Sequence, residues 1–120
     1  MFDQRINQKS FEYYKRLNRV KSFVESNLDR PITADQAAQV AGLSPGYFST
    51  FFKEKTGVRF SRWVTHLRVE RAMQRLEEHN EPITQLAYSA GYRDVRTFER
   101  AFKRLTGQTP HAFKVSNRPS

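Results

Sequence analysis

The sequence predicts an all-α fold of about seven helices, in which two helix-turn-helix units are joined by a long connecting helix. Three observations predict it. Apolar side chains recur at helical spacing along most of the chain, a helix–turn–helix pattern occurs twice about 50 residues apart, and one long helical pattern separates the copies. The 120 residues suffice for one domain with a substantial core.

The first predicted helix runs from about residue 10 to 28 and ends before Asp29-Arg30-Pro31. Its inward-facing side chains are expected to be Tyr13, Leu17, Val20 and Val24. We expect residues 10–115 to form the domain, while 1–9 and 116–120 are expected to be loose ends.

The first helix-turn-helix unit is predicted over about 10–57. Thr33 and Gln36 fit a capping box at the start of a short helix, and Gly42 falls where a tight turn needs a positive φ. Ser44 is a candidate N-cap before Pro45, so the next helix is expected over about 45–56. Its inward stripe is Phe48, Phe51 and Phe52.

The connecting helix is predicted over about 60–79. Its inward side chains are Phe60, Trp63, Val64, Leu67, Ala72, Met73 and Leu76. About 20 residues at 1.5 Å each span roughly 30 Å. Successive major grooves on one face of B-DNA lie about 34 Å apart, so a helix of this length could bring two reading helices to adjacent grooves.

The second unit, about 81–115, repeats the first. AAQVAGL (37–43) matches LAYSAGY (86–92), and FFKEKTG (51–57) matches AFKRLTG (101–107), with one extra residue between Gly91 and Phe98. Asp94 is a candidate N-cap and Gly107 a candidate C′ glycine, which predicts a helix over 95–106. Thr109 and Pro110 open a short last helix whose Phe113 is expected to pack on this unit.

The helix over 95–106 is basic on the side opposite its apolar stripe. Arg96, Arg100, Lys103 and Arg104 share that side. A solvated surface helix is one interpretation. The formal charge of +9 and the pI near 10.3 favour a polyanionic partner, because neutralised phosphates release counterions. The repeated unit on a basic chain favours DNA over the solvated face.

Enzymatic chemistry finds little support in the sequence. Cysteine is absent, which excludes disulfides, thiolate metal sites and a cysteine nucleophile. His66, His79 and His111 have no metal-ligand spacing, and each is expected to be an ordinary surface or half-buried histidine. There is no glycine-rich phosphate loop, no apolar run long enough for a membrane span and no signal-peptide pattern. We expect no enzyme, no cofactor and no metal.

The sequence resembles the DNA-binding domain of the AraC/XylS family of bacterial transcription regulators, and its second half carries the most specific part of the resemblance. ITQLAYSAGYRDVRTFERAFKRLTGQTPHAFK is similar to the family's succession of Ile, Ala, Gly-aromatic, Phe, Phe-Lys, Gly and Thr-Pro. Arg68, Ala72 and Leu76 also fall where the family carries Arg, Ala and Leu, and the resemblance covers about 15–114.

The resemblance implies seven helices, promoter binding as a monomer or dimer, and transcriptional activation, often through contact with RNA polymerase, in the bacterial cytoplasm at the nucleoid. Larger relatives carry a separate effector-binding or dimerisation domain, so such a domain is a further expectation if this chain is a fragment. The base-reading positions that the resemblance implies are Gly46, Ser49 and Thr50 in the first unit and Val95, Arg96, Thr97 and Arg100 in the second.

The two outer faces differ although their skeleton is shared. Alignment of Phe48 with Phe98 pairs Gly46 with Arg96 and Thr50 with Arg100. Only the arginines can make bidentate bonds to guanine, so the second unit is expected to supply most of the sequence discrimination. The expected phosphate contacts are Thr33, Lys53 and Lys103.

Three other classes of function are alternatives to a transcription regulator. A sequence-neutral architectural DNA-binding protein would rely on charge alone and is the main alternative. A module of a DNA-repair methyl-acceptor protein would need a thiol that this chain lacks. A helical partner-binding domain would need an exposed apolar patch.

Overall fold

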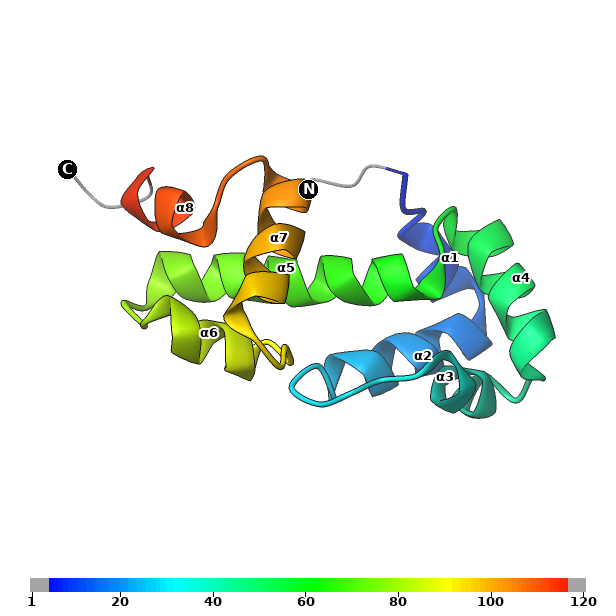
Figure 1. Cartoon of the computed structure of the whole chain (residues 1–120). Coiled ribbons are helices and arrows are strands. Elements are labelled where there is room, and N and C mark those ends of the chain that lie inside the picture. The colour runs from blue at the N-terminus through cyan, green and yellow to red at the C-terminus, as the bar shows by residue number, and fades with distance from the viewer. Residues whose placement is uncertain (1–4, 117–120) are drawn as a thin grey trace. The chain divides into compact units, whose positions relative to one another are not determined.

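The computed structural model describes residues 5–116, which form eight helices and no strand, so the predicted all-α class is confirmed (Figure 1). The helices are α1 (Lys9–Tyr13), α2 (Lys15–Glu25), α3 (Ala34–Ala41), α4 (Pro45–Thr56), α5 (Phe60–Glu78), α6 (Ile83–Ser89), α7 (Val95–Thr106) and α8 (Pro110–Ser116). The chain divides into two compact units, residues 5–64 and 65–116 of the described part, so the boundary falls within α5. The bounds predicted for the helices that became α4, α5 and α7 agree with the structure to within one residue.

The prediction of one helix over 10–28 was wrong, and this accounts for the eighth helix. The backbone of Tyr14 leaves the helical region, with φ −99° and ψ 115°, and separates α1 from α2. As a result Tyr13 is 79% exposed instead of facing the core, whereas Phe11 is buried. The ring of Tyr14 lies edge-on to Phe51 with centroids 5.6 Å apart, a tertiary contact that stabilises the break.

The core of the first unit is an aromatic cluster. Phe11 stacks on Trp63 with centroids 4.9 Å apart, and Phe52 lies 5.3 Å from the same indole. Phe48 and Phe60 complete the cluster, and both are buried. Trp63 is therefore a core anchor, as the sequence predicted.

Residues 5–8, before α1, are attached to the first unit rather than loose as expected, and the part of that expectation that concerns residues 1–4 lies outside the described residues. Ile6 is buried, and the backbone N–H of Asn7 donates to the Thr56 carbonyl at 2.7 Å. At Gly57, whose φ is +89°, a Cβ would lie 2.5 Å from the carbonyl oxygen of Arg5, so this close approach requires glycine. The expectation for 116–120 falls, beyond Ser116, outside the described residues.

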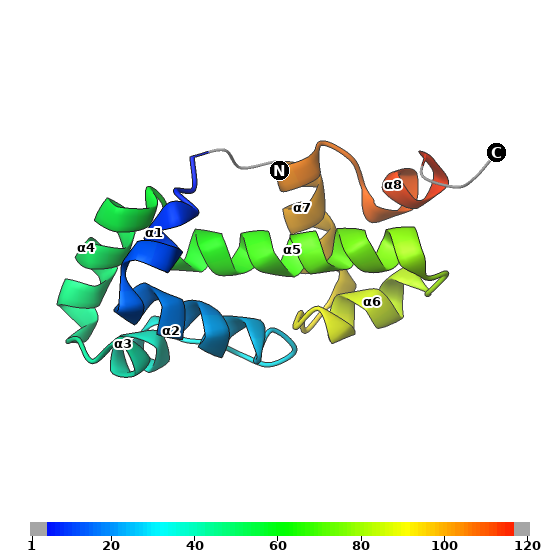
Figure 2. The same ribbon diagram turned by 180° about the vertical axis from the view of Figure 1, so that it is seen from behind.

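The core of the second unit is built by the later part of α5 together with α6, α7 and α8 (Figure 2). Phe102 contacts both Phe98 and Phe113, with centroids 5.8 Å and 5.5 Å apart, so the predicted packing of Phe113 on this unit is confirmed. Glu81, in the turn after α5, accepts from Arg75 Nε at 2.7 Å through its side chain and from Lys114 Nζ at 3.1 Å through its carbonyl. The turn is thus bound to α5 and to α8.

One histidine differs from expectation. His66 on α5 is almost fully buried, with its Nε2 3.6 Å from Glu70 Oε2, one helical turn later. Because histidine is a polar residue, the spacing of the apolar side chains along α5 did not predict that His66 is buried.

Candidate nucleic-acid interface

Each unit contains the same helix-ending turn between its two helices. The N–H of Leu43 donates to the Ala38 carbonyl at 3.0 Å, and the N–H of Tyr92 donates to the Ala87 carbonyl at 3.1 Å. The residue before each donor is a glycine with positive φ, +72° at Gly42 and +93° at Gly91. This is the bond of a Schellman turn, so the internal repeat found in the sequence is a repeat of backbone geometry.

The second helices of the two units also end alike. Thr56 Oγ1 donates to the Phe52 carbonyl at 2.7 Å, and Thr106 Oγ1 donates to the Phe102 carbonyl at 2.8 Å. In both copies the same hydroxyl accepts the N–H of the residue two positions later, after a glycine in the left-handed region. These shared ends fix α4 and α7 in equivalent places within their own units.

Arg16 makes two further hydrogen bonds in the first unit that the sequence did not suggest. Arg16 Nη1, on α2, donates to the Ala41 carbonyl at 2.6 Å and to the Gly42 carbonyl at 3.3 Å. It thereby satisfies carbonyls at the end of α3 that have no partner within that helix. The turn before α4 is thus fastened by a side chain from another helix.

The N-caps of the two second helices are where the copies begin to differ. Ser44 Oγ accepts the Tyr47 N–H at 3.4 Å, a long bond, whereas Asp94 Oδ1 accepts the Thr97 N–H at 2.8 Å. The backbone and side-chain hydrogen bonds from Thr97 hold the pKa of Asp94 below its ordinary value. Both caps predicted from the sequence are confirmed, and so is the capping box of Thr33 and Gln36.

The residues predicted to read bases lie on the surface with one exception. Gly46, Ser49, Thr50, Arg96, Thr97 and Arg100 are exposed, as are the predicted phosphate contacts Thr33, Lys53 and Lys103. Val95 is half-buried and packs against the core of the second unit, so only part of its side chain is accessible. Within each unit, the exposed positions of α4 or α7 lie opposite its buried stripe.

The outer face of α7 carries both long and constrained donors. Arg96 and Arg100 are exposed guanidinium groups one turn apart, able to reach beyond the helix surface. The Thr97 hydroxyl donates to Asp94 Oδ2 at 3.0 Å, so its single proton is engaged. What Thr97 offers a partner is therefore its oxygen lone pairs.

The side chains on the outer face of α4 are shorter than those on the outer face of α7. A Cβ added to Gly46 would have nothing within 4 Å, so packing does not require a glycine there. The Thr50 hydroxyl donates weakly to the Gly46 carbonyl at 3.4 Å. Neither residue extends far from the helix.

Sequence analysis missed Tyr47, which is 57% exposed in the first turn of α4. Its ring lies 6.0 Å from that of Phe51, which supports it on one side. Tyr47 stands where Thr97 stands in the second copy, two positions that the alignment of Phe48 with Phe98 brings together. Strict use of the repeat would have found it.

Comparison with known proteins identifies these units. A family model described as a helix-turn-helix domain matches residues 37–115, which is most of the chain. The chain is 27% identical to the multiple antibiotic resistance protein MarA of Escherichia coli over 101 residues, which cover 84% of this chain and 80% of MarA. It belongs to the AraC/XylS family.

Two further proteins are similar to this chain. The raffinose operon transcriptional regulatory protein RafR of Pediococcus pentosaceus is 32% identical over 111 residues, which cover 92% of this chain and 39% of RafR. The DNA-binding domain of the global transcriptional factor AdpA, solved with a target DNA, shares the fold with a TM-score of 0.79 at 24% identity, covering 86% of this chain and 92% of that one. The family predicted from the sequence is thus confirmed.

The AraC/XylS family consists of DNA-binding transcription regulators and not of enzymes. Residues 5–116 hold no group of three or more histidine, aspartate or glutamate side chains placed to bind a metal ion. In the same part of the chain, no helix combines the length and apolar character that a membrane crossing needs.

Proposed function

We propose that this protein is a sequence-specific transcription regulator, probing double-stranded DNA with α4 and α7 in two adjacent major grooves and activating the promoters it binds. The observation that carries this proposal is the doubled unit, in which the same turn and the same helix ends present two exposed helix faces on a chain of charge +9. The solved complex of AdpA with its target DNA and the regulatory role of RafR support the choice of partner.

The length of α5 supports the reading of two grooves. Its 19 residues, at 1.5 Å each, span about 28 Å. One turn of B-DNA advances about 34 Å, so a helix of this length suits two contacts on one face of the duplex. Both helix-turn-helix units would then contribute to a single binding site.

Base discrimination is assigned mainly to α7. Arg96 and Arg100 can each make bidentate bonds to guanine O6 and N7, whereas the Thr97 oxygen can accept from the amino group of adenine or cytosine. Val95 contributes its accessible methyl surface. Because the Thr97 hydroxyl already donates its proton to Asp94, Thr97 is expected to accept a hydrogen bond from the base.

The α4 face is assigned mainly to position and shape readout. Gly46 permits close approach of the backbone, Ser49 and Thr50 offer short hydroxyl groups, and the exposed ring of Tyr47 can contact a thymine methyl or a sugar. The first box of the DNA site is accordingly expected to be the less discriminating one.

Phosphate contacts complete the interface. Lys53 and Lys103 occupy equivalent exposed places late in α4 and α7, where a flexible ammonium group suits the DNA backbone better than a base edge. Thr33 stands at the N-terminus of α3, where first-turn amides can donate to a phosphate.

The remaining partners belong to the same proposal. Activation is assigned to contact with RNA polymerase, and the site of action is the bacterial nucleoid in the cytoplasm. If the sequence is a piece of a longer regulator, an effector-binding or dimerisation domain accompanies it; the chain spans 39% of RafR but 80% of MarA.

The test is a salt titration of affinity on a duplex selected from random sequence and on a scrambled duplex of equal length. A specific regulator is expected to prefer the selected duplex by roughly a thousandfold or more at physiological salt. An architectural protein would bind both duplexes alike, with an affinity set by salt alone. That second result would replace the proposed function.

A further inference from the structure

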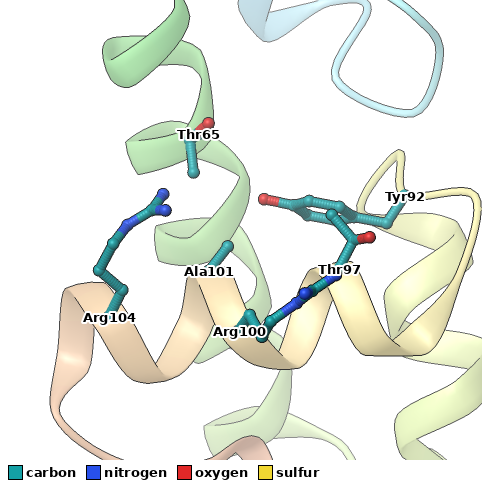
Figure 3. A pocket seen from close by; sticks show the side chains of 6 residues that line it. All are labelled: Thr65, Tyr92, Thr97, Arg100, Ala101 and Arg104. Atoms are coloured by element: carbon teal, nitrogen blue, oxygen red, sulfur yellow. The ribbon is translucent and has the colours of Figure 1, made fainter.

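A cavity of about 370 Å³ lies beside α7 in the second unit. It is lined by Thr65, Tyr92, Thr97, Arg100, Ala101 and Arg104 (Figure 3). Thr65 comes from α5, Tyr92 from the turn before α7, and the remaining four from α7 itself. The cavity therefore adjoins the outer face of α7 on the side toward α5.

Two of the lining side chains carry a positive charge, and no lining side chain carries a negative one. Arg100 and Arg104 are one turn apart on α7, and both are exposed. Their guanidinium groups are planar donor forks that match the geometry of a carboxylate or phosphate. The hydroxyl-bearing side chains of Thr65 and Thr97 add polar groups to the same walls. This chemistry favours an oxyanion.

The Tyr92 hydroxyl is a second, independent sign of a missing polar partner. It is buried and has no hydrogen-bond partner among the described residues, although buried hydroxyls are ordinarily paired. Figure 3 shows it directed toward the space between Thr65 and α7. The ring itself is fixed, with Phe98 5.4 Å away and the Arg68 guanidinium carbon 5.9 Å from its centroid.

The protonation state of Tyr92 suits an anionic neighbour. Burial raises the pKa of the Tyr92 phenol, and the positive charges of Arg68 and Arg104 oppose that rise only in part. The phenol is therefore neutral at physiological pH and can donate its proton to an oxyanion without repelling it.

The size and the apolar walls of the cavity argue for more than a bare anion. A volume of about 370 Å³ lies within the range of small-molecule sites and exceeds the needs of a single phosphate group. The Tyr92 ring and the Ala101 methyl offer apolar surface beside the two guanidinium groups. A planar organic body attached to the oxyanion would occupy that surface.

We propose that this cavity binds a small organic anion, an aryl carboxylate or aryl phosphate. Its oxyanion is held by Arg100 and Arg104, and its ring lies against Tyr92. On the proposed function, Arg100 also reads DNA bases, so the bound anion and the DNA compete for this side chain. The protein would then carry a small-molecule control within its DNA-binding domain.

The experiment is a titration of the full chain with phenyl phosphate in the absence of DNA, followed by two-dimensional NMR. Saturable shifts are expected at the amides of Thr65, Tyr92 and Thr97. Arg104→Ala should weaken binding by about tenfold or more, because it removes a charged guanidinium fork, and Tyr92→Phe by several-fold, because it removes one hydroxyl donor. Arg71→Ala is the matched control, because Arg71 is an exposed arginine of α5 outside the cavity. It should leave the affinity unchanged.

Three results would overturn the proposal. Equal loss in Arg104→Ala and Arg71→Ala would mean that only net charge matters. If inorganic phosphate bound with the same affinity as phenyl phosphate, the ring would contribute nothing and the cavity would bind a bare anion. Absence of binding to the free protein, together with a smaller salt slope for DNA binding by Arg104→Ala, would assign the cavity to a phosphate of the DNA backbone.

A competition arm separates this proposal from the proposed function. Phenyl phosphate should weaken binding to the selected duplex in the wild-type chain and much less in Arg104→Ala. Saturable binding of phenyl phosphate by a chain that prefers no DNA sequence would support the cavity site and overturn the proposed function. Specific DNA binding without any phenyl phosphate binding would support the proposed function and overturn the cavity site.

Discussion

Asp94 binds Thr97 at two points: one carboxylate oxygen accepts the Thr97 backbone N–H at 2.8 Å, and the other accepts the Thr97 hydroxyl at 3.0 Å. The first bond caps α7, while the second determines which way the hydroxyl proton points. A single side chain thus links the start of the helix to the hydrogen-bonding character of a predicted base contact.

Asp94→Asn is expected to change base preference rather than abolish binding. Asparagine caps helices as well as aspartate does, but its NH₂ group would donate to the Thr97 oxygen and release the Thr97 proton toward the DNA. Preference at one base pair should move from an amino group, on adenine or cytosine, toward a carbonyl, on guanine or thymine. Affinities for the four base pairs at each position would measure this.

Asp94→Ala is the control for that substitution. It removes both bonds, so it should lower thermal stability and weaken binding to all duplexes. The freed Thr97 hydroxyl could then either donate or accept, so the preference at that base pair should weaken rather than reverse. An unchanged base profile in Asp94→Asn would contradict the assignment of Thr97 as an accepting contact.

Arg96→Ala and Thr50→Ala are expected to differ in their effect on specificity. Loss of the Arg96 guanidinium should cost about 1–3 kcal/mol of discrimination at one guanine, because a bidentate pair is lost. Thr50 offers one short hydroxyl already directed to the Gly46 carbonyl, so its loss should matter less. Matched and mismatched duplexes, titrated by fluorescence anisotropy, give both values. A larger loss of specificity in Thr50→Ala would contradict the assignment of discrimination to α7.

Gly46→Arg is expected to give the first unit a long guanine-reading side chain equivalent to Arg96. The position is exposed, an added Cβ meets nothing within 4 Å, and it is equivalent to Arg96 in the repeat. Replacement of a helical glycine should also stabilise α4 by roughly 0.5–1 kcal/mol. Duplex selection with the variant should show a new guanine preference in the first box. A selected motif identical to that of the wild type would show that α4 does not present position 46 to bases.

Gly57→Ala and Gly107→Ala form a matched pair for the fold. Both glycines end a helix with φ near +85°, at +89° and +83°, so alanine at either position is strained by roughly 1–2 kcal/mol. At Gly57 the Cβ would also lie 2.5 Å from the Arg5 carbonyl oxygen, whereas Gly107 has nothing within 4 Å. Urea denaturation should show the larger loss of unfolding free energy in Gly57→Ala. Equal losses would mean that the segment before α1 yields freely.

Local signals explain why α4 and α7 could be predicted closely. Ser44-Pro45 and Asp94 mark their starts and Gly57 and Gly107 their ends, and each signal acts through neighbouring backbone groups. The repeat added the equivalence of the two helices, and the resemblance added the residues on their outer faces. Their roles toward DNA stay predictions, because they depend on a partner.

Features made by contacts between distant residues could not be predicted. The break at Tyr14 has no glycine or proline, and the apolar spacing of Tyr13 and Leu17 continues across it. At the break, Tyr14 packs on Phe51, which lies far along the chain, and local spacing does not indicate such a contact. The same holds for three other features: the burial of Ile6, the hydrogen bond from Arg16 to the Ala41 carbonyl, and the cavity beside α7. Each depends on residues that approach one another only after folding.

On the proposed function, both units read one DNA site and α7 supplies most of the discrimination. Selection of bound duplexes from random DNA, with the wild-type chain and Arg96→Ala in parallel, tests it most directly. We expect an asymmetric motif of two boxes about one helical turn, roughly 10 base pairs, apart, with the more informative box degraded in Arg96→Ala. Absence of an enriched motif, or a single box untouched by Arg96→Ala, would contradict it.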